Sequence, residues 1–322
     1  MLGLVAVALC VGRFTVTLDQ LGALAWSRLT GTPSGVPGNV ETVILAVRGP
    51  RVLAALAVGA VLAAAGTAYQ ALFRNPLVSP DILGVSSGAA LGAVLGIWLS
   101  LGVVAIQALA FAVGLLAVVV VYLLGTALRR HDPILVLVLA GVVIGTLLGS
   151  CVSLVKYLAD PYNQLPAITF WLLGSLAAVT AGDVGAILPA VVLGLVPLYL
   201  LRWRMNVMTL GDEEAQALGV DTRRVRLAVV AGATLMTAAA VSLSGIVGWI
   251  GLLVPHVGRL LVGPDFGRLL PASILLGAGY LLAVDTLART MASLEVPLGV
   301  LTALLGAPFF VWVLARSRRG WA

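Results

Sequence analysis

The 322-residue sequence has few charged residues: Asp, Glu, Lys and Arg make up only 10% of it, whereas 61% is hydrophobic. This composition, with a mean hydropathy of +1.13, excludes an ordinary soluble domain and is typical of a multi-pass membrane protein. Lys156 is the single lysine, and the arginines are scattered between apolar runs. The net charge of +6 therefore forms no basic stripe, and we expect no nucleic-acid partner.

Cysteine and histidine are also scarce. Cys10 and Cys151 both fall inside apolar runs, with no second cysteine or histidine at ligand spacing. We interpret them as small core residues rather than as a disulfide or a metal site. His256 lies beside a proline and near an arginine, where a hydrogen-bonded structural role is more common than ligation of a metal or haem.

Acidic residues are nearly absent from the apolar runs. Asp285 is the only one well inside a run, and it precedes Arg289 by one helical turn, which favours a structural pair over an ion site. A carrier driven by protons or sodium usually keeps an ionisable residue deep in a span, so the energy source must lie elsewhere. The chain itself lacks a nucleotide-binding phosphate loop, because its only lysine is followed by Tyr157.

The length of the chain accommodates about ten membrane spans of roughly 20 residues. We therefore predict an all-α, polytopic membrane protein with about ten transmembrane helices, forming a single permease domain over 1–322. Met1–Gly12 is apolar like a signal-peptide core, but no basic region precedes it, so a first span with a short start is the better interpretation. The predicted spans are 1–18, 51–73, 82–100, 103–125, 133–156, 183–201, 225–244, 246–263, 270–288 and 298–315.

Two segments between the spans are too long for simple turns. Residues 19–50 contain a Pro/Gly-rich stretch, Gly31 to Gly38, and are predicted to form an irregular outer loop. Residues 157–182 include Phe170 and Trp171 and could hold a short interfacial or re-entrant helix.

Arginine placement gives the orientation. With alternating spans and a cytoplasmic N-terminus, most basic residues fall on the inner side, which is the expected bias. Both termini and the segment 202–224 then face the cytoplasm. The inner residues are Arg74, Arg129, Arg130, Arg202, Arg204, Arg223, Arg224, Arg226, Arg259, Arg268, Arg316, Arg318 and Arg319; the outer ones are Arg28, Arg48, Arg51, Lys156 and Arg289, with Arg13 near the outer end of the first span.

The most informative segment is a charged island between two apolar runs, residues 210–219. Asp212, Glu213 and Glu214 stand where a helix would begin, favoured there by the helix dipole. Gly219 stands just past its end, and Asp221 offers an N-cap for the next run. A soluble helix between two spans indicates a soluble partner on the cytoplasmic side, and 202–224 is the predicted coupling segment.

A second inner segment, Asn75 to Asp81, contains two prolines and so cannot be helical throughout. It leads into a span rich in small residues, which allow close helix packing. Asn75 and Leu77 could lie at the inner mouth of a transport pathway, or the segment could be only a rigid turn.

Together these motifs resemble the FecCD-type permeases, the membrane subunits of ABC importers for ferric siderophores, haem and cobalamin. The resemblance covers nearly the whole chain. The matching segments are 48–51 (RGPR), 70–77 (QALFRNPL), 79–88 (SPDILGVSSG), the island 211–219, 248–256 (GWIGLLVPH), 295–299 (EVPLG) and 306–308 (GAP).

The resemblance implies ten spans, a homodimer around a central pathway, two ATPase subunits on the cytoplasmic side and one substrate-binding protein outside. It places ATP and magnesium on the ATPase and no cofactor or metal in this chain. It also implies a bacterial cytoplasmic (inner) membrane. Asp132 to Leu135 does not clearly match the second inner-gate segment of the family and receives no role. The implied site residues are Gly211, Asp212, Glu214, Ala215, Leu218 and Gly219 for ATPase coupling, Asn75 and Leu77 for the inner gate, and Arg48, Arg51 and Arg289 for docking of the binding protein.

The predicted function is the permease of an ATP-driven importer for a metal chelate, working by alternating access. The open alternatives are a molybdate or tungstate importer, and a secondary carrier or channel without an ATPase. For the arginines, the structural alternative is that Arg48 and Arg51 anchor the outer end of the second span and Arg289 pairs with Asp285.

Overall fold

The computed structural model describes residues 1–127 and 133–317, and within these ranges the protein is helical with no strand. Several residues named above lie outside the described ranges: Arg129, Arg130, Asp132, Arg318 and Arg319. The helices are α1 (Leu2–Cys10), α2 (Leu18–Thr30), α3 (Gly38–Thr42), α4 (Gly49–Leu72), α5 (Val85–Trp98), α6 (Val103–Ala127), α7 (Pro133–Leu158), α8 (Gln164–Leu173), α9 (Ala181–Leu200), α10 (Arg202–Met208), α11 (Asp212–Ala217), α12 (Thr222–Ser244), α13 (Ile250–Val262), α14 (Phe266–Ala288) and α15 (Leu298–Ser317), with a π-helical segment Val43–Arg48 and a 3₁₀ turn Pro80–Leu83.

Six helices in the described part of the chain are long and apolar enough to cross a membrane, and four shorter helices are also apolar. The structure therefore supports a polytopic, all-helical membrane protein, although it does not confirm ten full spans. The six are Gly38–Leu72, Val103–Ala127, Ile134–Leu158, Ala181–Leu200, Thr222–Ser244 and Phe266–Ala288; the four are Val85–Trp98, Gln164–Leu173, Ile250–Val262 and Leu298–Trp312.

The N-terminal region differs from the sequence prediction in two places. The expected first span, 1–18, is helical only over Leu2–Cys10, a rise of about 14 Å at 1.5 Å per residue, which is half of a bilayer core. The expected irregular loop 19–50 is largely helical, and only 31–37 is irregular.

Local capping explains the extra helix in this region. Thr17 caps α2 in a reciprocal pair with Gln20, so the helix begins at Leu18. Pro37 then precedes a continuous helical run through Leu72 that is much longer than the predicted second span.

The short helix expected within 157–182 is present as α8. The two residues just after α8 join two other elements: Gly174 accepts a hydrogen bond from the backbone N–H of Leu298 at 3.0 Å, and the backbone N–H of Ser175 donates to the carbonyl of Ser244 at 2.8 Å. The end of α8 therefore meets the start of α15 and the end of α12.

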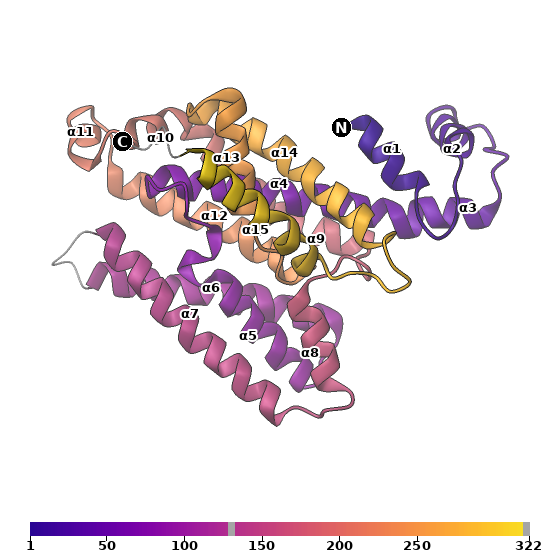
Figure 1. Cartoon of the computed structure of the whole chain (residues 1–322), viewed down its shortest axis with the longest axis horizontal. Coiled ribbons are helices and arrows are strands. Elements are labelled where there is room, and N and C mark those ends of the chain that lie inside the picture. The colour runs from indigo at the N-terminus through magenta and orange to yellow at the C-terminus, as the bar shows by residue number, and fades with distance from the viewer. Residues whose placement is uncertain (128–132, 318–322) are drawn as a thin grey trace.

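Helix α4 lies at the centre of the packing, against α14, α12 and α13 (Figure 1). Glycines allow these helices to touch backbone to backbone: a Cβ atom on Gly59 would stand 2.2 Å from the carbonyl oxygen of Gly277 in α14. The same holds for Gly66 and Gly251 of α13, at 2.0 Å. Small residues at such crossings are the usual device for packing helices in membranes.

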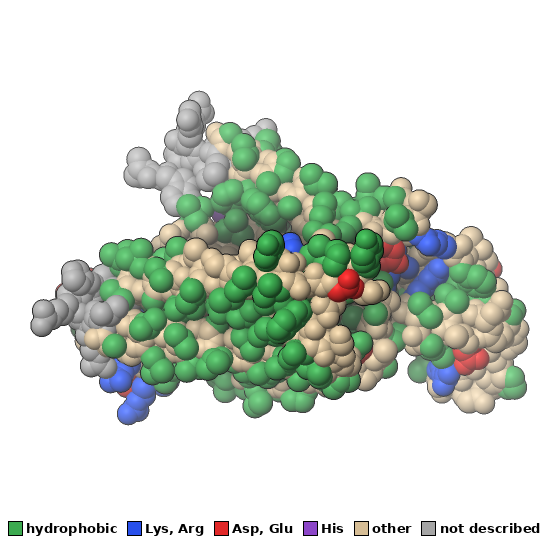
Figure 2. Space-filling model, turned by 90° about the horizontal axis from the view of Figure 1, so that it is seen from below, with side chains coloured by type: hydrophobic (Ala, Val, Ile, Leu, Met, Phe, Trp, Pro, Cys, Tyr) green, Lys and Arg blue, Asp and Glu red, His purple; other side chains and the backbone are tan. Residues whose placement is uncertain are grey.

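Helices α5 to α8 form a second group beside α12, and the two groups meet through contacts of α12 with α5 and α6 (Figure 1). Helices α10 and α11 lie at one end of the long axis, and α2 and α3 lie at the other. Figure 2 shows a broad apolar band across the middle of one face, with most of the visible charged side chains toward the two ends. This distribution suits a body embedded in lipid with a polar region at each surface.

Candidate functional site

The predicted gate residues lie on a turn directly after α4. The Asn75 side-chain oxygen accepts the backbone N–H of Leu77 at 2.9 Å, and the Asn75 N–H donates to the carbonyl of Gln70 at 3.1 Å. Val78 and Pro80 are buried and fix the far side of the turn. Leu77 is 52% exposed on this rigid support. An apolar side chain held outward suits a gate, and that role stays a prediction.

The charged island forms the short helix α11, as expected. Its first turn holds the three acidic residues, Gly219 follows its end with φ 81°, and the Asp221 side chain caps α12 by accepting the Arg224 N–H at 3.0 Å. Each local signal that the sequence carried is therefore present.

The exposed face of α11 differs from the one predicted. Ala215, expected on the partner-facing surface, is 0% exposed and packs into the core of this chain, so it cannot supply a contact to a partner. Leu218 is 57% exposed, and Glu214 and Gly219 are also exposed. Gly211 is buried with φ 133°, at a point where a Cβ would meet the Glu214 carboxylate. The available surface therefore consists of Glu213, Glu214, Gln216, Ala217, Leu218 and Gly219.

Polar side chains fix α11 to the membrane helices. Asp212 pairs with Arg226 of α12 at 2.6 Å. In the preceding helix, α10, the Asn206 side chain donates to Asp265 at 2.7 Å and accepts the N–H of Phe266 at 2.7 Å, at the start of α14. Asp212 therefore ties α11 to α12, and Asn206 ties the neighbouring α10 to the start of α14.

At the opposite end of the molecule, Arg51 binds two carboxylates. Its Nε and Nη2 contact Asp285 of α14 at 2.9–3.1 Å, and its Nη1 and Nη2 contact the two oxygens of Glu295 at 2.9 Å each. Asp285 is fully buried and also forms an ion pair with Arg289 at 3.8 Å. The structural pair expected between Asp285 and Arg289 is thus confirmed.

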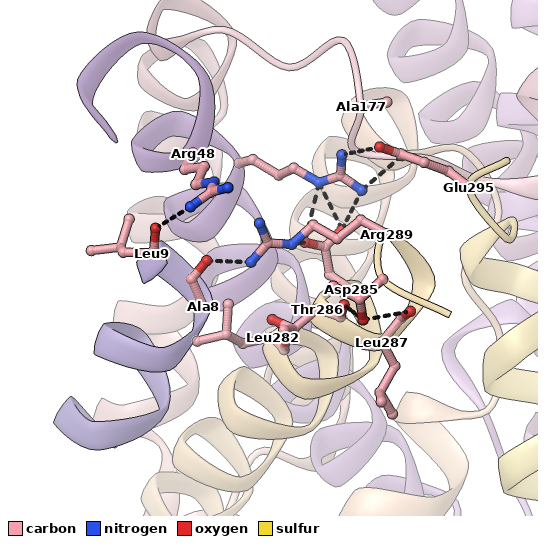
Figure 3. A network of polar contacts seen from close by, with 12 residues as sticks. Ala8, Leu9, Arg48, Ala177, Leu282, Asp285, Thr286, Leu287, Arg289 and Glu295 are labelled. Atoms are coloured by element: carbon pink, nitrogen blue, oxygen red, sulfur yellow. Dashed lines mark hydrogen bonds and ion pairs between the residues drawn. The ribbon is translucent and has the colours of Figure 1, made fainter. Parts of the chain in front are cut away.

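The other two arginines bind the end of α1 (Figure 3). Arg48 donates to the carbonyls of Leu9 and Cys10 at 2.6 and 3.0 Å and to that of Phe14, and Arg289 donates to the carbonyl of Ala8. The last carbonyls of a helix have no partner within it and carry partial negative charge. The two guanidinium groups therefore cap the short first helix.

None of the three predicted docking arginines is free at the surface: Arg48, Arg51 and Arg289 are between 5% and 8% exposed. Their present contacts match the anchoring alternative. Docking of a binding protein stays a prediction, and it requires an incoming carboxylate to replace an internal partner. Glu295 is the replaceable one, since its side chain is 33% exposed. Hydrogen bonds from Arg51 hold the pKa of Glu295 below its usual value.

Two polar relationships were missed by the sequence analysis. The motif beginning at Glu295 was noted without its contact to Arg51, which lies 244 residues away. Gln70 was noted within its motif, yet its buried contacts with α13 were not foreseen. His256, expected to be hydrogen-bonded, instead packs edge-on against Phe310 at 6.4 Å, and its Nδ1 has no hydrogen-bond partner among the described residues.

The helical body and its two polar ends are those of a multi-pass membrane protein. The chain belongs to the FecCD transport family, which it matches over residues 1–316.

Among curated proteins, the chain is 43% identical to the cobalamin import system permease protein of Halobacterium salinarum, over 91% of this chain and 80% of that protein. It is 36% identical to the molybdate import system permease protein of Haemophilus influenzae, covering 98% and 92% respectively. It is 39% identical to the hemin transport system permease protein of Yersinia pestis, covering 93% and 91%. A solved structure described as an inward-facing putative metal-chelate type ABC transporter matches with a TM-score of 0.88 at 35% identity, covering 98% and 96%.

Proposed function

We propose that this chain is the permease subunit of an ATP-driven importer that carries a metal chelate, such as a ferric siderophore, haem or cobalamin, into the cytoplasm by alternating access. Family membership supports the transport role. The observation that carries the ATP-driven part is α11, an exposed charged helix tied by Asp212 and Arg226 to the membrane-spanning α12. A carrier that works without an ATPase does not need an exposed helix of this kind on its cytoplasmic side.

The proposed assembly is a homodimer of permeases with about ten spans each, two ATPase subunits and one binding protein. Both termini and the segment 202–224 face the cytoplasm in this proposal, in a bacterial inner membrane. ATP and magnesium belong to the ATPase. Glu214, Leu218 and Gly219 contact the ATPase in this proposal, Asp212 ties the segment to Arg226, and the buried Gly211 and Ala215 support it from inside.

Asn75 and Leu77 form the inner gate in this proposal, and each Leu77 faces its twin across the dimer axis. On the outer side, carboxylates of the binding protein dock by exchanging with Glu295 at Arg51. Arg48 and Arg289 bind further carboxylates of the binding protein beside Arg51, after their hydrogen bonds to the end of α1 break.

Molybdate import is the second candidate, because the relative named for molybdate matches 98% of this chain at 36% identity, close to the values for the chelate relatives. A secondary carrier is less well supported. Within the described residues, the buried acid Asp285 is engaged by Arg51, so it is not free to bind a coupling ion.

The test is uptake into vesicles that contain the assembled transporter. Cobalamin, haem, a ferric siderophore and molybdate are each supplied together with a substrate-binding protein that binds the transporter. We expect accumulation of one chelate only when ATP is present on the α11 side. Accumulation of molybdate alone would replace the chelate proposal, and uptake that ignores ATP would overturn the importer mechanism.

A further inference from the structure

Helix α13 contains a proline in its interior, Pro255. Proline has no backbone N–H, so the carbonyl four residues earlier, that of Gly251, loses its partner in the helix. This carbonyl lies where α13 touches α4, against Gly66. An unpaired carbonyl buried between two helices is costly, and another donor must satisfy it.

The donor is Gln70, near the end of α4. Its side-chain nitrogen donates to the carbonyls of Gly251 at 3.2 Å and Leu252 at 3.1 Å, and the residue is 2% exposed. Its side-chain oxygen accepts a hydrogen bond from Arg259, one turn beyond Pro255. The amide therefore restores the bond that Pro255 removes, and Arg259 fixes which way the amide points.

The same residue holds the inner turn. The backbone carbonyl of Gln70 accepts the N–H of Asn75, and Asn75 in turn holds the N–H of Leu77. One residue thus connects α13, through its side chain, with the exposed Leu77, through its backbone. Helix α13 also contacts α14 and α15, so a displacement of those helices reaches the turn through Gln70.

We infer that Gln70 is the positioning residue of the inner gate: it transmits movement of α13, whose hydrogen-bond ladder is interrupted at Pro255, to the turn that carries Asn75 and Leu77. This inference rests on the proposed gate role of those two residues. Glutamine is required because the position needs a donor toward α13 and an acceptor toward Arg259. Leucine supplies neither, and glutamate supplies only the acceptor.

The test uses cross-linking between two copies of Leu77→Cys in the transporter assembled with its ATPase subunits. The two native cysteines are free and are first replaced, as Cys10→Ala and Cys151→Ala. Cross-link yield is measured without nucleotide and with ATP trapped. Gln70→Leu and Gln70→Glu are compared with Thr67→Val, which removes a buried hydroxyl from the same helix that bonds only within that helix, to Ala63.

We expect a nucleotide-dependent yield in the parent and in Thr67→Val, and the loss of that dependence in both Gln70 variants. ATP hydrolysis should continue in the Gln70 variants while transport falls. A purely structural role would lower the amount of folded protein without removing the response to ATP in what remains. A full response in Gln70→Leu, or an equal loss in Thr67→Val, would overturn the inference.

Misfolding of Gln70→Leu, and failure of the gate assignment itself, can each be distinguished from failure of the role of Gln70. If Gln70→Leu does not fold, it is combined with Pro255→Ala, whose backbone N–H can bond the Gly251 carbonyl directly, and the pair is compared with Pro255→Ala alone. The combined variant should fold and still lack the response, and a retained response would count against Gln70. If the parent itself shows no response, the gate assignment fails; if the parent responds and Gln70→Leu responds equally, only the role of Gln70 fails.

Discussion

Arg51 and Glu295 lie 244 residues apart in the chain and meet through two parallel hydrogen bonds of 2.9 Å. This fork geometry is the strongest arrangement an arginine can make with a carboxylate. It fixes the loop after α14 over the start of α4. Arg51 is also the arginine predicted to dock a binding protein, and it already binds a carboxylate, the group that such a partner would bring. Glu295 is therefore an internal competitor for the proposed docking site.

The first prediction follows from this competition. Glu295→Gln should increase the affinity of the binding protein by about 1.4-fold to fivefold, because Arg51 loses a partially exposed partner worth about 0.2–1 kcal/mol. Surface immobilisation of the transporter and titration with the binding protein would measure the change. Arg51→Ala should weaken the same complex. Unchanged affinity in Glu295→Gln, together with a lower thermal midpoint, would leave Arg51 as a span anchor.

The second prediction compares the two carboxylates around Arg51. Asp285 is fully buried between Arg51 and Arg289, whereas the Glu295 side chain is 33% exposed. Asp285→Asn removes the buried counter-charge that Arg51 and Arg289 share, leaves only the partly exposed Glu295 beside Arg51, and should cost about 3–5 kcal/mol. Glu295→Gln should cost about 0.2–1 kcal/mol. Thermal unfolding in detergent ranks the two variants, and equal losses would contradict the difference in burial.

The outer arginines show what the sequence could and could not predict. Positive-inside alternation brought Arg48, Arg51 and Arg289 to one surface, since it depends only on the order of apolar runs. Their burial could not be predicted in this way, because the partners come from distant segments: Asp285 and Glu295 for Arg51, and the end of α1 for Arg48.

In the island at 210–219, too, the sequence predicted some features correctly and missed others. Its start, its end and the next N-cap follow from local signals, and all were predicted correctly. The inward direction of the Ala215 side chain was not predicted, because a helix of six residues is too short for an apolar period to identify its inner face. The loop 19–50 was misjudged since glycine and proline in 31–38 dominated the prediction, whereas the capping pair of Thr17 and Gln20 was overlooked.

The third prediction concerns the exposed face of α11. Leu218→Asp should reduce co-purification of the ATPase about tenfold or more, because burying an unpaired carboxylate costs more than the roughly 1–3 kcal/mol of an unpaired neutral polar group, and about 1.4 kcal/mol already corresponds to tenfold. The control is Leu99→Asp at the other surface, since both leucines are 57% exposed. Ala215→Arg should instead lower the yield of folded permease. Equal co-purification of the Leu218 and Leu99 variants would remove α11 from the contact.

The fourth prediction tests the backbone contact between α4 and α14. Gly59→Ala forces a Cβ against the Gly277 carbonyl and should destabilise the protein by about 1–3 kcal/mol. Gly149→Ala, within α7, meets nothing within 4 Å and should stabilise slightly, by roughly 0.5–1 kcal/mol, through helix propensity. Thermal midpoints of the two variants should therefore move in opposite directions, and a tolerated Gly59→Ala would contradict the close crossing.

The last prediction uses the pH dependence of the Arg51–Glu295 pair. Hydrogen bonds from Arg51 hold the pKa of Glu295 below the usual 4.5. A carboxyl whose pKa is lower in the folded state contributes stability above its unfolded pKa and loses it as pH falls through the folded pKa. The difference in thermal midpoint between wild type and Glu295→Gln should therefore be full at neutral pH and shrink below about pH 4.5.

The control for that series is Glu41→Gln, which removes a carboxylate from the exposed pair with Arg28. Its effect at neutral pH should be smaller than that of Glu295→Gln, because solvent screens an exposed pair more strongly. A difference between wild type and Glu295→Gln that stays constant down to about pH 3 would show that Glu295 acts through packing rather than charge. The proposed competition with a docking carboxylate would then lose its electrostatic basis, because replacing Glu295 would not remove a charge that is paired with the Arg51 guanidinium.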